Sequence, residues 1–236
     1  MVNLIIDFGN TRTKAAIFDD KKLVETHGNI NITGLRLLID QYRPNYLMVS
    51  SVSTAPDKIK AELGQDIFFL THQTAVPFHI DYKTPETLGL DRIAAVAGAQ
   101  ALFPNQNCLV IDTGTCITYD FLDQDGHHLG GSITPGINMR FKAMHTFTAN
   151  LPLLNFEKNV DLVGKTTKEA MQSGVLYGII GEINEIIRRY EHKFATLQII
   201  ICGGDAKSFE NKLKADIFAS PELVLIGLNR ILLYNV

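Results

Sequence analysis

The chain has 236 residues, of which 46% are hydrophobic and 20% charged, and its net charge is −3. This length suits one large or two small domains with real hydrophobic cores, and nothing in the slightly acidic balance predicts a basic nucleic-acid surface. The three cysteines have no short spacing, which argues against a disulfide framework or a zinc site. The sequence contains no apolar run of about 18 residues and no charged segment before an apolar leader, so we expect a cytoplasmic protein without a membrane span.

The first predicted elements are two strands that flank an unusually polar turn, in "NLIIDFGNTRTKAAIF" starting at Asn3. A plain hairpin needs only one or two turn residues. This turn holds a carboxylate, a flexible glycine and several groups that can donate hydrogen bonds to phosphate: Asp7, Gly9, Asn10, Thr11, Arg12, Thr13 and Lys14. The composition therefore indicates a ligand-binding turn.

Alternating helix and strand patterns follow this hairpin. The sequence predicts a helix near residues 34–42, a strand at 46–50, a helix at 55–63 and a strand at 66–70. The stretch "RIAAVAGAQALF", residues 92–103, predicts a further helix. Strands joined to alternating helices and strands imply an α/β core with a mixed sheet.

The hairpin pattern repeats with an offset of 105 residues, which is about the length of a domain. "LVIDTGTCITYDFLDQDGHHL", starting at Leu109, places Asp112 where Asp7 stands and Gly114 where Gly9 stands. Two such halves predict two lobes, which we expect to be domains of residues 1–107 and 108–236.

The second half continues with a long helical pattern at residues 168–190 and a buried strand at 197–204. A short helix is expected after Asp205, which could cap it. The closing stretch "LVLIGLNRILLYNV", residues 223–236, is interpreted as a strand followed by a helix.

Two acidic turns in equivalent positions favour phosphate chemistry. Glycine lets the backbone approach a ligand, and the hydroxyl and basic groups can contact phosphate oxygens. A carboxylate does not contact phosphate comfortably, but it can hold a cation that does. Asp7 and Asp112 are therefore interpreted as cation-holding groups; the alternative is that each merely caps its turn.

Two further segments allow more than one interpretation. Gly130, Gly131, Pro135 and Gly136 surround Ile133 and predict a loop whose backbone approaches a substrate or the other lobe. Arg140 follows on a predicted helix, where a solvated face and a phosphate contact are equally plausible roles.

Four motifs together resemble the type III pantothenate kinases, a family within the actin, heat-shock chaperone and sugar kinase superfamily. They are "DFGNTRTK" (7–14), "GLDR" (89–92), "DTGTCIT" (112–118) and "GGSITPG" (130–136). The resemblance implies an α/β fold of two ribonuclease-H-like domains, each with a mixed five-stranded sheet, and an ATP cleft between them.

The resemblance also implies roles for single residues. The segment from Asp7 to Lys14 would bind the ATP phosphates and the accompanying Mg²⁺, and Thr115 would also contact ATP. Asp112 would hold a monovalent cation, K⁺ or NH₄⁺. In the predicted pantothenate site, Asp91 is the expected catalytic base, and the substrate contacts are Tyr82, Gly89, Leu90, Asp91, Arg92 and Thr167.

Thr167 would reach the substrate from the neighbouring subunit of a homodimer, with the adjacent Thr166 as a competitor for that role. The chemistry of the "GLDR" pair is consistent with the resemblance, because a guanidinium suits the carboxylate of pantothenate and an aspartate can accept a proton from its hydroxyl. The alternative for Asp91 and Arg92 is a surface helix start.

We therefore expect ATP-dependent phosphorylation of pantothenate to 4′-phosphopantothenate, the first step of coenzyme A biosynthesis. One alternative is another kinase of the superfamily that acts on a sugar, which would offer Arg92 no carboxylate. The other alternative is a non-catalytic nucleotide-binding regulator.

Overall fold

The computed structural model describes residues 1–9, 11–52, 54–64 and 66–236. The chain divides into two compact units: Met1–Gln106, Leu122–Gly130 and Glu222–Val236 form unit 1, while Asn107–Phe121 and Gly131–Pro221 form unit 2. These units are defined by packing and are discontinuous in sequence. The domain boundary expected after residue 107 therefore stays a prediction.

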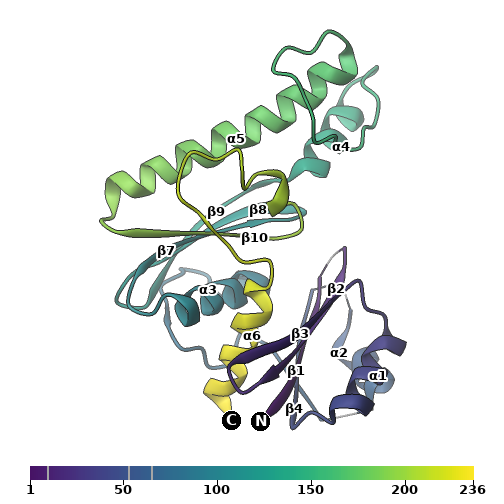
Figure 1. Ribbon diagram of the computed structural model, residues 1–236, viewed down its shortest axis with the longest axis vertical. Coiled ribbons are helices and arrows are strands. Elements are labelled where there is room, and N and C mark those ends of the chain that lie inside the picture. The colour runs from purple at the N-terminus through teal and green to yellow at the C-terminus, as the bar shows by residue number, and fades with distance from the viewer. Residues whose placement is uncertain (10, 53, 65) are drawn as a thin grey trace. The chain divides into compact units, whose positions relative to one another are not determined.

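Unit 1 contains a five-stranded mixed sheet in the order β3-β2-β1-β4-β5 (Figure 1). Its strands are β1 (Val2–Phe8), β2 (Thr13–Asp19), β3 (Lys22–Gly28), β4 (Tyr46–Ser51) and β5 (Ile67–Phe69). The central strand β1 runs antiparallel to β2 and parallel to β4. Strand β1 is mostly buried because both faces of the sheet are covered, whereas the edge strand β3 alternates between exposed and half-buried residues.

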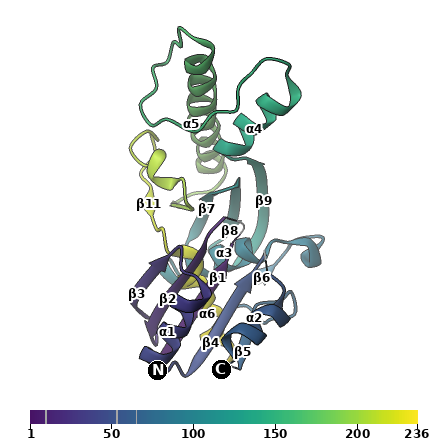
Figure 2. The same cartoon turned by 90° about the vertical axis from the view of Figure 1, so that its right-hand side faces the viewer.

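Helices cover both faces of this sheet. They are α1 (Ile32–Tyr42), α2 (Pro56–Leu63), α3 (Leu90–Leu102) and α6 (Leu223–Asn235), with a 3-10 turn at Pro85–Thr87. Helix α1 begins at Asn31, whose side chain accepts a hydrogen bond from the Gly34 N–H at 2.8 Å. Leu35 of α1 and Ile59 of α2 pack with Leu4 of β1 in one core cluster. Figure 2 shows α1 and α2 beside the strands of this sheet.

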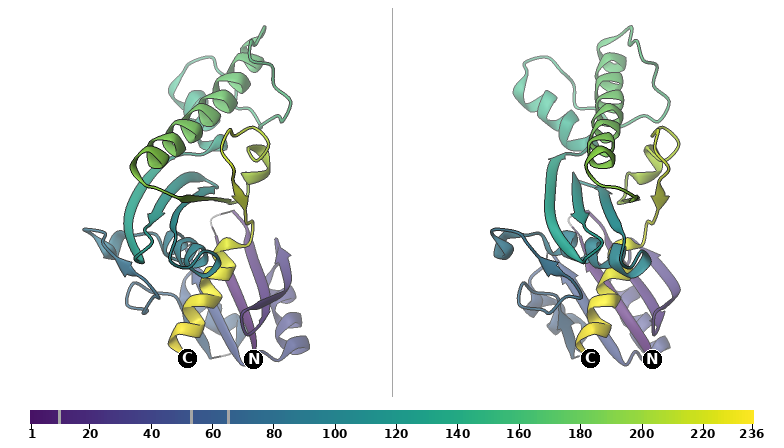
Figure 3. Two further views of the ribbon diagram at one scale, coloured as in Figure 1. Left: turned by 60° about the vertical axis from the view of Figure 1, so that its left-hand side comes forward. Right: turned by 90° about the vertical axis from the view of Figure 1, so that its left-hand side faces the viewer.

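The opposite face of the sheet is covered by α6, which also packs against α3 (Figure 3). The two helices approach closely at glycines: a Cβ at Gly98 would lie 2.3 Å from the Leu223 carbonyl oxygen, and one at Gly227 would lie 1.7 Å from that of Ala94. Asn229 of α6 accepts a hydrogen bond from the Asn3 side chain at 2.9 Å in the buried interior. The strand predicted at the start of residues 223–236 is therefore wrong, because this apolar run is helical from Leu223 onward.

The second sheet has six strands in the order β11-β10-β7-β8-β9-β6. They are β6 (His79–Ile80), β7 (Asn107–Thr113), β8 (Cys116–Leu122), β9 (His127–Pro135), β10 (Leu197–Cys202) and β11 (Phe218–Ala219). This is one strand more than the expected five, and the two edge strands, β6 and β11, have only two residues each. The parallel pairing of β10 with β7 makes this sheet mixed as well.

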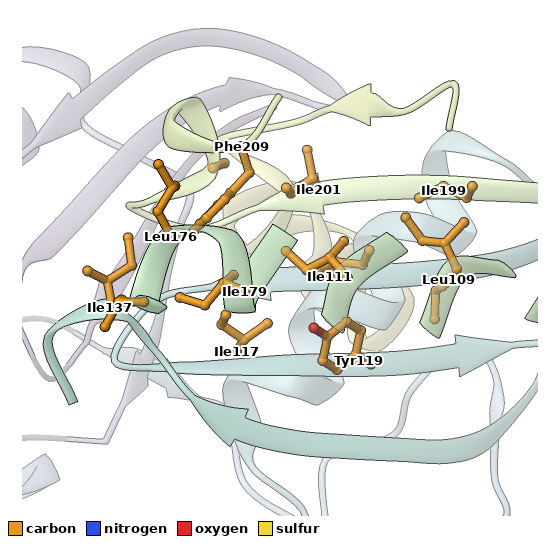
Figure 4. Close-up of a cluster of buried hydrophobic side chains, with 14 of the residues drawn as sticks. Leu109, Ile111, Ile117, Tyr119, Ile137, Leu176, Ile179, Ile199, Ile201 and Phe209 are labelled. Atoms are coloured by element: carbon orange, nitrogen blue, oxygen red, sulfur yellow. The ribbon is translucent and has the colours of Figure 1, made fainter. Parts of the chain in front are cut away.

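Unit 2 has α4 (Ile137–Phe147), α5 (Thr167–Lys193) and a 3-10 turn at Ala206–Ser208. Leu176 and Ile179 of α5 pack against Ile111 of β7 and Tyr119 of β8 in its core (Figure 4). The α/β fold class with two mixed sheets is thereby confirmed. Among the helices of the described residues, none has both the length and the apolar character needed to cross a lipid bilayer.

Candidate functional site

The first polar turn lies between the end of β1 and the start of β2, in unit 1. Asp7 is paired across the strands with Lys14 on one side and with Ser50 on the other. A Cβ at Gly9 would lie 3.1 Å from the Arg12 carbonyl oxygen, so a side chain would crowd the turn. An acid, a base and a hydroxyl group thus occupy neighbouring positions at one end of the sheet.

The remaining predicted phosphate ligands lie in the same turn. Thr11 and Arg12 are exposed, while Gly9 and Thr13 are half buried. Asn10 falls outside the described residues. Exposed hydroxyl and guanidinium groups can reach an anionic ligand without first breaking a buried contact.

Ser50 is a candidate polar contact that the sequence analysis did not single out. Its side chain is fully buried beside Asp7, and its Oγ has no hydrogen-bond partner among the described residues. A buried hydroxyl without a partner costs about 1–3 kcal/mol, so such groups usually meet water or a ligand. The only sequence signal was the change from apolar residues to the serine pair Ser50–Ser51 at the end of β4.

The "GLDR" motif forms the start of α3, with Gly89 as the N-cap and Leu90 as the first helical residue. Asp91 lies in the first turn, and its Oδ1 accepts a hydrogen bond from the Arg92 N–H at 2.9 Å. A Cβ at Gly89 would lie 2.5 Å from Asp91 Oδ1, so only glycine fits here without moving the carboxylate. Arg92 is only 6% exposed, which differs from a solvated helix start.

Tyr82 lies beside Arg92. The guanidinium carbon of Arg92 is 5.7 Å from the Tyr82 ring centroid, a cation–π distance. A Cβ at Gly130 would approach the same ring to 3.1 Å, and Gly130 has a φ of +89°. Two of the predicted substrate residues are therefore brought together in unit 1, with glycine backbone against the tyrosine ring.

The segment before Tyr82 is held by an ion pair. The Nδ1 of His127 lies 2.8 Å from Asp81 Oδ2, and the Asp81 N–H donates to the His128 carbonyl oxygen at 3.0 Å. The hydrogen bond with Asp81 raises the pKa of His127 above its ordinary value. No role was predicted for His127 from the sequence, because no spacing pattern links it to Asp81.

The second acidic turn lies in unit 2, between β7 and β8. Asp112 is paired with Cys202 on the parallel strand β10. A Cβ at Gly203, which has a φ of +94°, would lie 2.4 Å from both Asp112 Oδ1 and the Thr113 carbonyl oxygen. The Asp205 N–H donates to the same carbonyl at 2.9 Å, and no cap hydrogen bond forms from the Asp205 side chain.

The "GGSITPG" stretch is strand β9 and the start of α4, so the predicted loop is wrong. A Cβ at Gly131 would lie 1.6 Å from the Tyr119 carbonyl oxygen on the neighbouring strand, and this close approach requires glycine. A Cβ at Gly136 would lie 2.3 Å from the Gly114 carbonyl oxygen, and its N–H donates to the Thr115 carbonyl oxygen at 3.1 Å. Gly136 therefore supports the second turn, while the Thr115 side chain remains exposed.

A buried polar network surrounds Glu182 of α5. Its Oε1 accepts hydrogen bonds from the hydroxyls of Tyr119 at 2.9 Å and Thr134 at 2.7 Å, and its Oε2 accepts one from Arg140 Nη2 at 2.5 Å. Burial opposes ionisation of Glu182, but the bonds from Arg140, Thr134 and Tyr119 outweigh it and lower the pKa of this carboxyl. The same burial raises the pKa of Tyr119. Arg140 is thus bonded to Glu182. This contact differs from both roles considered from the sequence, a solvated helix face and a phosphate contact.

The start of α5 separates the roles of two adjacent threonines. Thr166 is the N-cap, and its hydroxyl accepts a hydrogen bond from the Glu169 N–H at 3.2 Å. Glu169 in turn accepts one from the Lys165 N–H at 2.7 Å, which completes a capping arrangement. The hydroxyl of Thr167, in the first helical position, has no hydrogen bond among the described residues.

The acidic residues of the two turns offer oxygen donors, which hard cations prefer. Among the described residues, no three or more His, Cys, Asp or Glu side chains gather into a metal-binding group. Asp7 could bind Mg²⁺ only together with phosphate oxygens or water, which is how proteins commonly hold this ion. At Asp112, the carboxylate and the Thr113 carbonyl oxygen both lie close to Gly203, and oxygen atoms are the ligands that hard cations prefer.

Comparisons with known proteins agree on one family. A sequence model of type III pantothenate kinase matches residues 3–189 of the chain. The chain is 44% identical over 239 residues to a type III pantothenate kinase of Phocaeicola vulgatus, and 99% of both chains is covered.

Two solved structures share the fold. One is a protein of Campylobacter jejuni named as a Baf family transcriptional activator, with a TM-score of 0.64, 24% identity and 98% of both chains covered. The other is the activator of 2-hydroxyisocaproyl-CoA dehydratase from Clostridium difficile with bound ADPNP, with a TM-score of 0.57 and 12% identity, covering 98% of this chain and 93% of that one. At these identities the likeness concerns the fold alone.

Proposed function

Because this chain belongs to the type III pantothenate kinase family, we propose that it transfers the γ-phosphoryl group of ATP to the primary hydroxyl of pantothenate. The observation that best supports this function is the start of α3, where a buried Arg92 and a half-buried Asp91 are adjacent and Tyr82 lies against the guanidinium. The product would be 4′-phosphopantothenate, so the reaction would be the first step of coenzyme A biosynthesis.

Pantothenate offers a carboxylate and a primary hydroxyl, and the two charged residues of the "GLDR" motif suit these groups. The planar guanidinium of Arg92 can bind the carboxylate through two hydrogen bonds, and its contact with Tyr82 limits its orientations. Asp91 can accept the hydroxyl proton as the phosphoryl group is transferred. Gly89 and Leu90 would contact the substrate through their backbone, since the N-cap leaves helix N–H groups without internal partners.

The turn from Asp7 to Lys14 would bind the phosphates of ATP. Lys14, Arg12 and the hydroxyls of Thr11 and Thr13 would offset the charge of the transferring group, which is the main catalytic contribution expected for a loose transition state. Asp7 would orient Mg²⁺, which neutralises phosphate charge when bound. Asn10, outside the described residues, would contribute to the same contacts, and Thr115 would contact ATP from the second turn.

Asp112 would bind a monovalent cation, K⁺ or NH₄⁺. Support comes from the Asp112 carboxylate and the Thr113 carbonyl oxygen, two oxygen donors that both lie close to Gly203. We therefore expect turnover to depend on the monovalent salt that is supplied.

A homodimer would complete the substrate site through Thr167. Support comes from four large apolar side chains around the segment that leads into α5: Phe147 is 85% exposed, Leu153 61%, Leu162 68% and Val163 72%. Such exposure over neighbouring parts of the chain is typical of surfaces that another protein covers. The free hydroxyl of Thr167 follows Val163 by four residues.

A coupled assay of ADP release tests the function. The purified chain should release ADP from ATP and Mg²⁺ when pantothenate is added, and faster in K⁺ than in Na⁺. Release with a hexose and none with pantothenate would favour the sugar kinase alternative. ADP binding by calorimetry without turnover of either compound would favour the non-catalytic regulator.

A further inference from the structure

The Glu182 network has no role in the function proposed above, although it joins four elements of unit 2. Glu182 lies in the middle of α5, Tyr119 on β8, Thr134 on β9 and Arg140 on α4. The side chains of Glu182 and Arg140 are only 23% and 21% exposed. Both charged groups are hydrogen-bonded, since Glu182 accepts three bonds and Arg140 donates two.

Arg140 connects this network to the end of β9. Its Nη2 donates to Glu182, while its Nε donates to the Pro135 carbonyl oxygen at 2.8 Å. One planar guanidinium therefore fixes the position of Pro135 relative to α5.

The residue after Pro135 contacts the second acidic turn. Gly136 donates its N–H to the Thr115 carbonyl oxygen at 3.1 Å, and its Cα lies so close to Gly114 and Thr115 that no Cβ would fit. A continuous series of contacts thus runs from Glu182 through Arg140 and Pro135 to Gly136 and the turn. Each link is a hydrogen bond, a peptide bond or a close backbone contact.

We propose that Glu182, acting through Arg140, positions the Thr115 turn for nucleotide binding. Glu182 is then a positioning residue, because it touches the turn only through other residues. The inference rests on the proposed function in one respect, the contact of Thr115 with ATP.

The test replaces Glu182 with Gln, which keeps the size and an acceptor oxygen but removes the charge that holds Arg140. We expect the KM for ATP and the Kd for ADP, measured by calorimetry, to rise about tenfold, as the loss of one charge-assisted hydrogen bond would produce. The KM for pantothenate should change by less than about twofold, because its proposed contacts lie in unit 1 apart from Thr167, which is about four helical turns before Glu182 on α5.

Two further variants make the test specific. Glu185→Gln is the matched control, since Glu185 lies on the same helix and, among the described residues, bonds to Arg188 and Arg189 alone on the exposed surface. This variant should leave every constant unchanged. Arg140→Lys keeps a positive charge near Glu182 but lacks the second donor for Pro135, so it should also weaken ADP binding. It also serves as the milder variant if Glu182→Gln fails to fold.

An unchanged Kd for ADP in folded Glu182→Gln and Arg140→Lys would overturn the proposal. An equal rise in both KM values with a matching loss of Tm would also overturn it, since that pattern indicates only general destabilisation. If the wild-type chain binds ADP but does not phosphorylate pantothenate, the proposed function fails while the Kd comparison still decides the role of Glu182. If the wild-type chain does not bind ADP, both proposals fail.

Discussion

At the scale of single residues, adjacent side chains at the start of α3 have different surroundings. Arg92 is buried against Tyr82, whereas Asp91 is half buried and accepts a hydrogen bond from the backbone next to it. The motif predicted that both residues are important. It could not predict the burial of Arg92, which depends on Tyr82 ten residues earlier.

Replacing Asp91 with Asn tests its proposed role as the base. The amide oxygen can still accept the hydrogen bond from the Arg92 N–H, so the helix start should keep its geometry. We expect kcat to fall by about 100- to 10,000-fold, the usual contribution of a positioned base. Binding of ADP by calorimetry should stay within about threefold of the wild type, since Asp91 is not among the proposed nucleotide contacts. Wild-type turnover in this variant would exclude Asp91 as the base.

The Asp81–His127 pair predicts a pH effect on the segment that carries Tyr82. Because the folded-state pKa of His127 is raised above 6.5, the pair stabilises the fold at pH values below 6.5 and loses this contribution as pH rises through the folded pKa. Asp81→Asn should therefore lower the pKa of His127, as measured by NMR titration of its ring protons. Asp57→Asn on α2 is the control, and an equal shift in both variants would argue against the pair.

At the scale of elements, hydrophobic patterns predicted most of the fold. The two hairpins, the helix at 92–103 and the long helix at 168–190 correspond to observed elements, with ends that differ by a few residues. The strand predicted at the start of residues 223–236 was wrong. Helix α6 is apolar on most of its sides because both α3 and the sheet pack against it. A short apolar run of this kind fits a buried strand and a buried helix equally well.

The loop predicted for residues 130–136 was wrong for a different reason. Turn-forming composition suggested a loop, yet Gly131 is required by the Tyr119 carbonyl on the neighbouring strand. The sequence alone does not show which strands will be neighbours. A glycine that is required because another backbone lies close to it therefore cannot be distinguished in the sequence from a glycine that a turn requires. For the same reason, the sequence did not show that Ser50 would be buried beside Asp7, or that the residues of the Glu182 network would meet.

The start of α5 allows the two threonines to be distinguished by experiment. Thr166→Ala should lower the free energy of unfolding by about 1 kcal/mol, because it removes the N-cap hydroxyl, and should leave the KM for pantothenate unchanged. Thr167→Ala should raise the KM for pantothenate without changing stability. Urea unfolding and steady-state kinetics on both variants measure the difference, and the reverse pattern would assign the substrate contact to Thr166.

At the scale of the whole molecule, the proposed homodimer depends on the exposed apolar residues before α5. Replacing Leu162 and Val163 with Asp should convert a dimer to a monomer in light scattering after size exclusion, because two carboxylates would be buried without partners. Turnover should be lost together with the dimer, since Thr167 would no longer reach the substrate site of the neighbouring subunit. Val24→Asp, at a 51% exposed position of β3, is the control. A wild-type chain that is monomeric and active would contradict the proposal.

The packing of α6 also has a consequence for biosynthesis. Strands β1, β2 and β4 leave the ribosome early, but the helix that covers one face of their sheet, Leu223–Asn235, is synthesised more than 150 residues later. That apolar face therefore stays uncovered on the nascent chain until translation of this helix is complete. Ribosome-bound intermediates that end before Leu223 should consequently recruit chaperones, because an uncovered apolar sheet face favours aggregation.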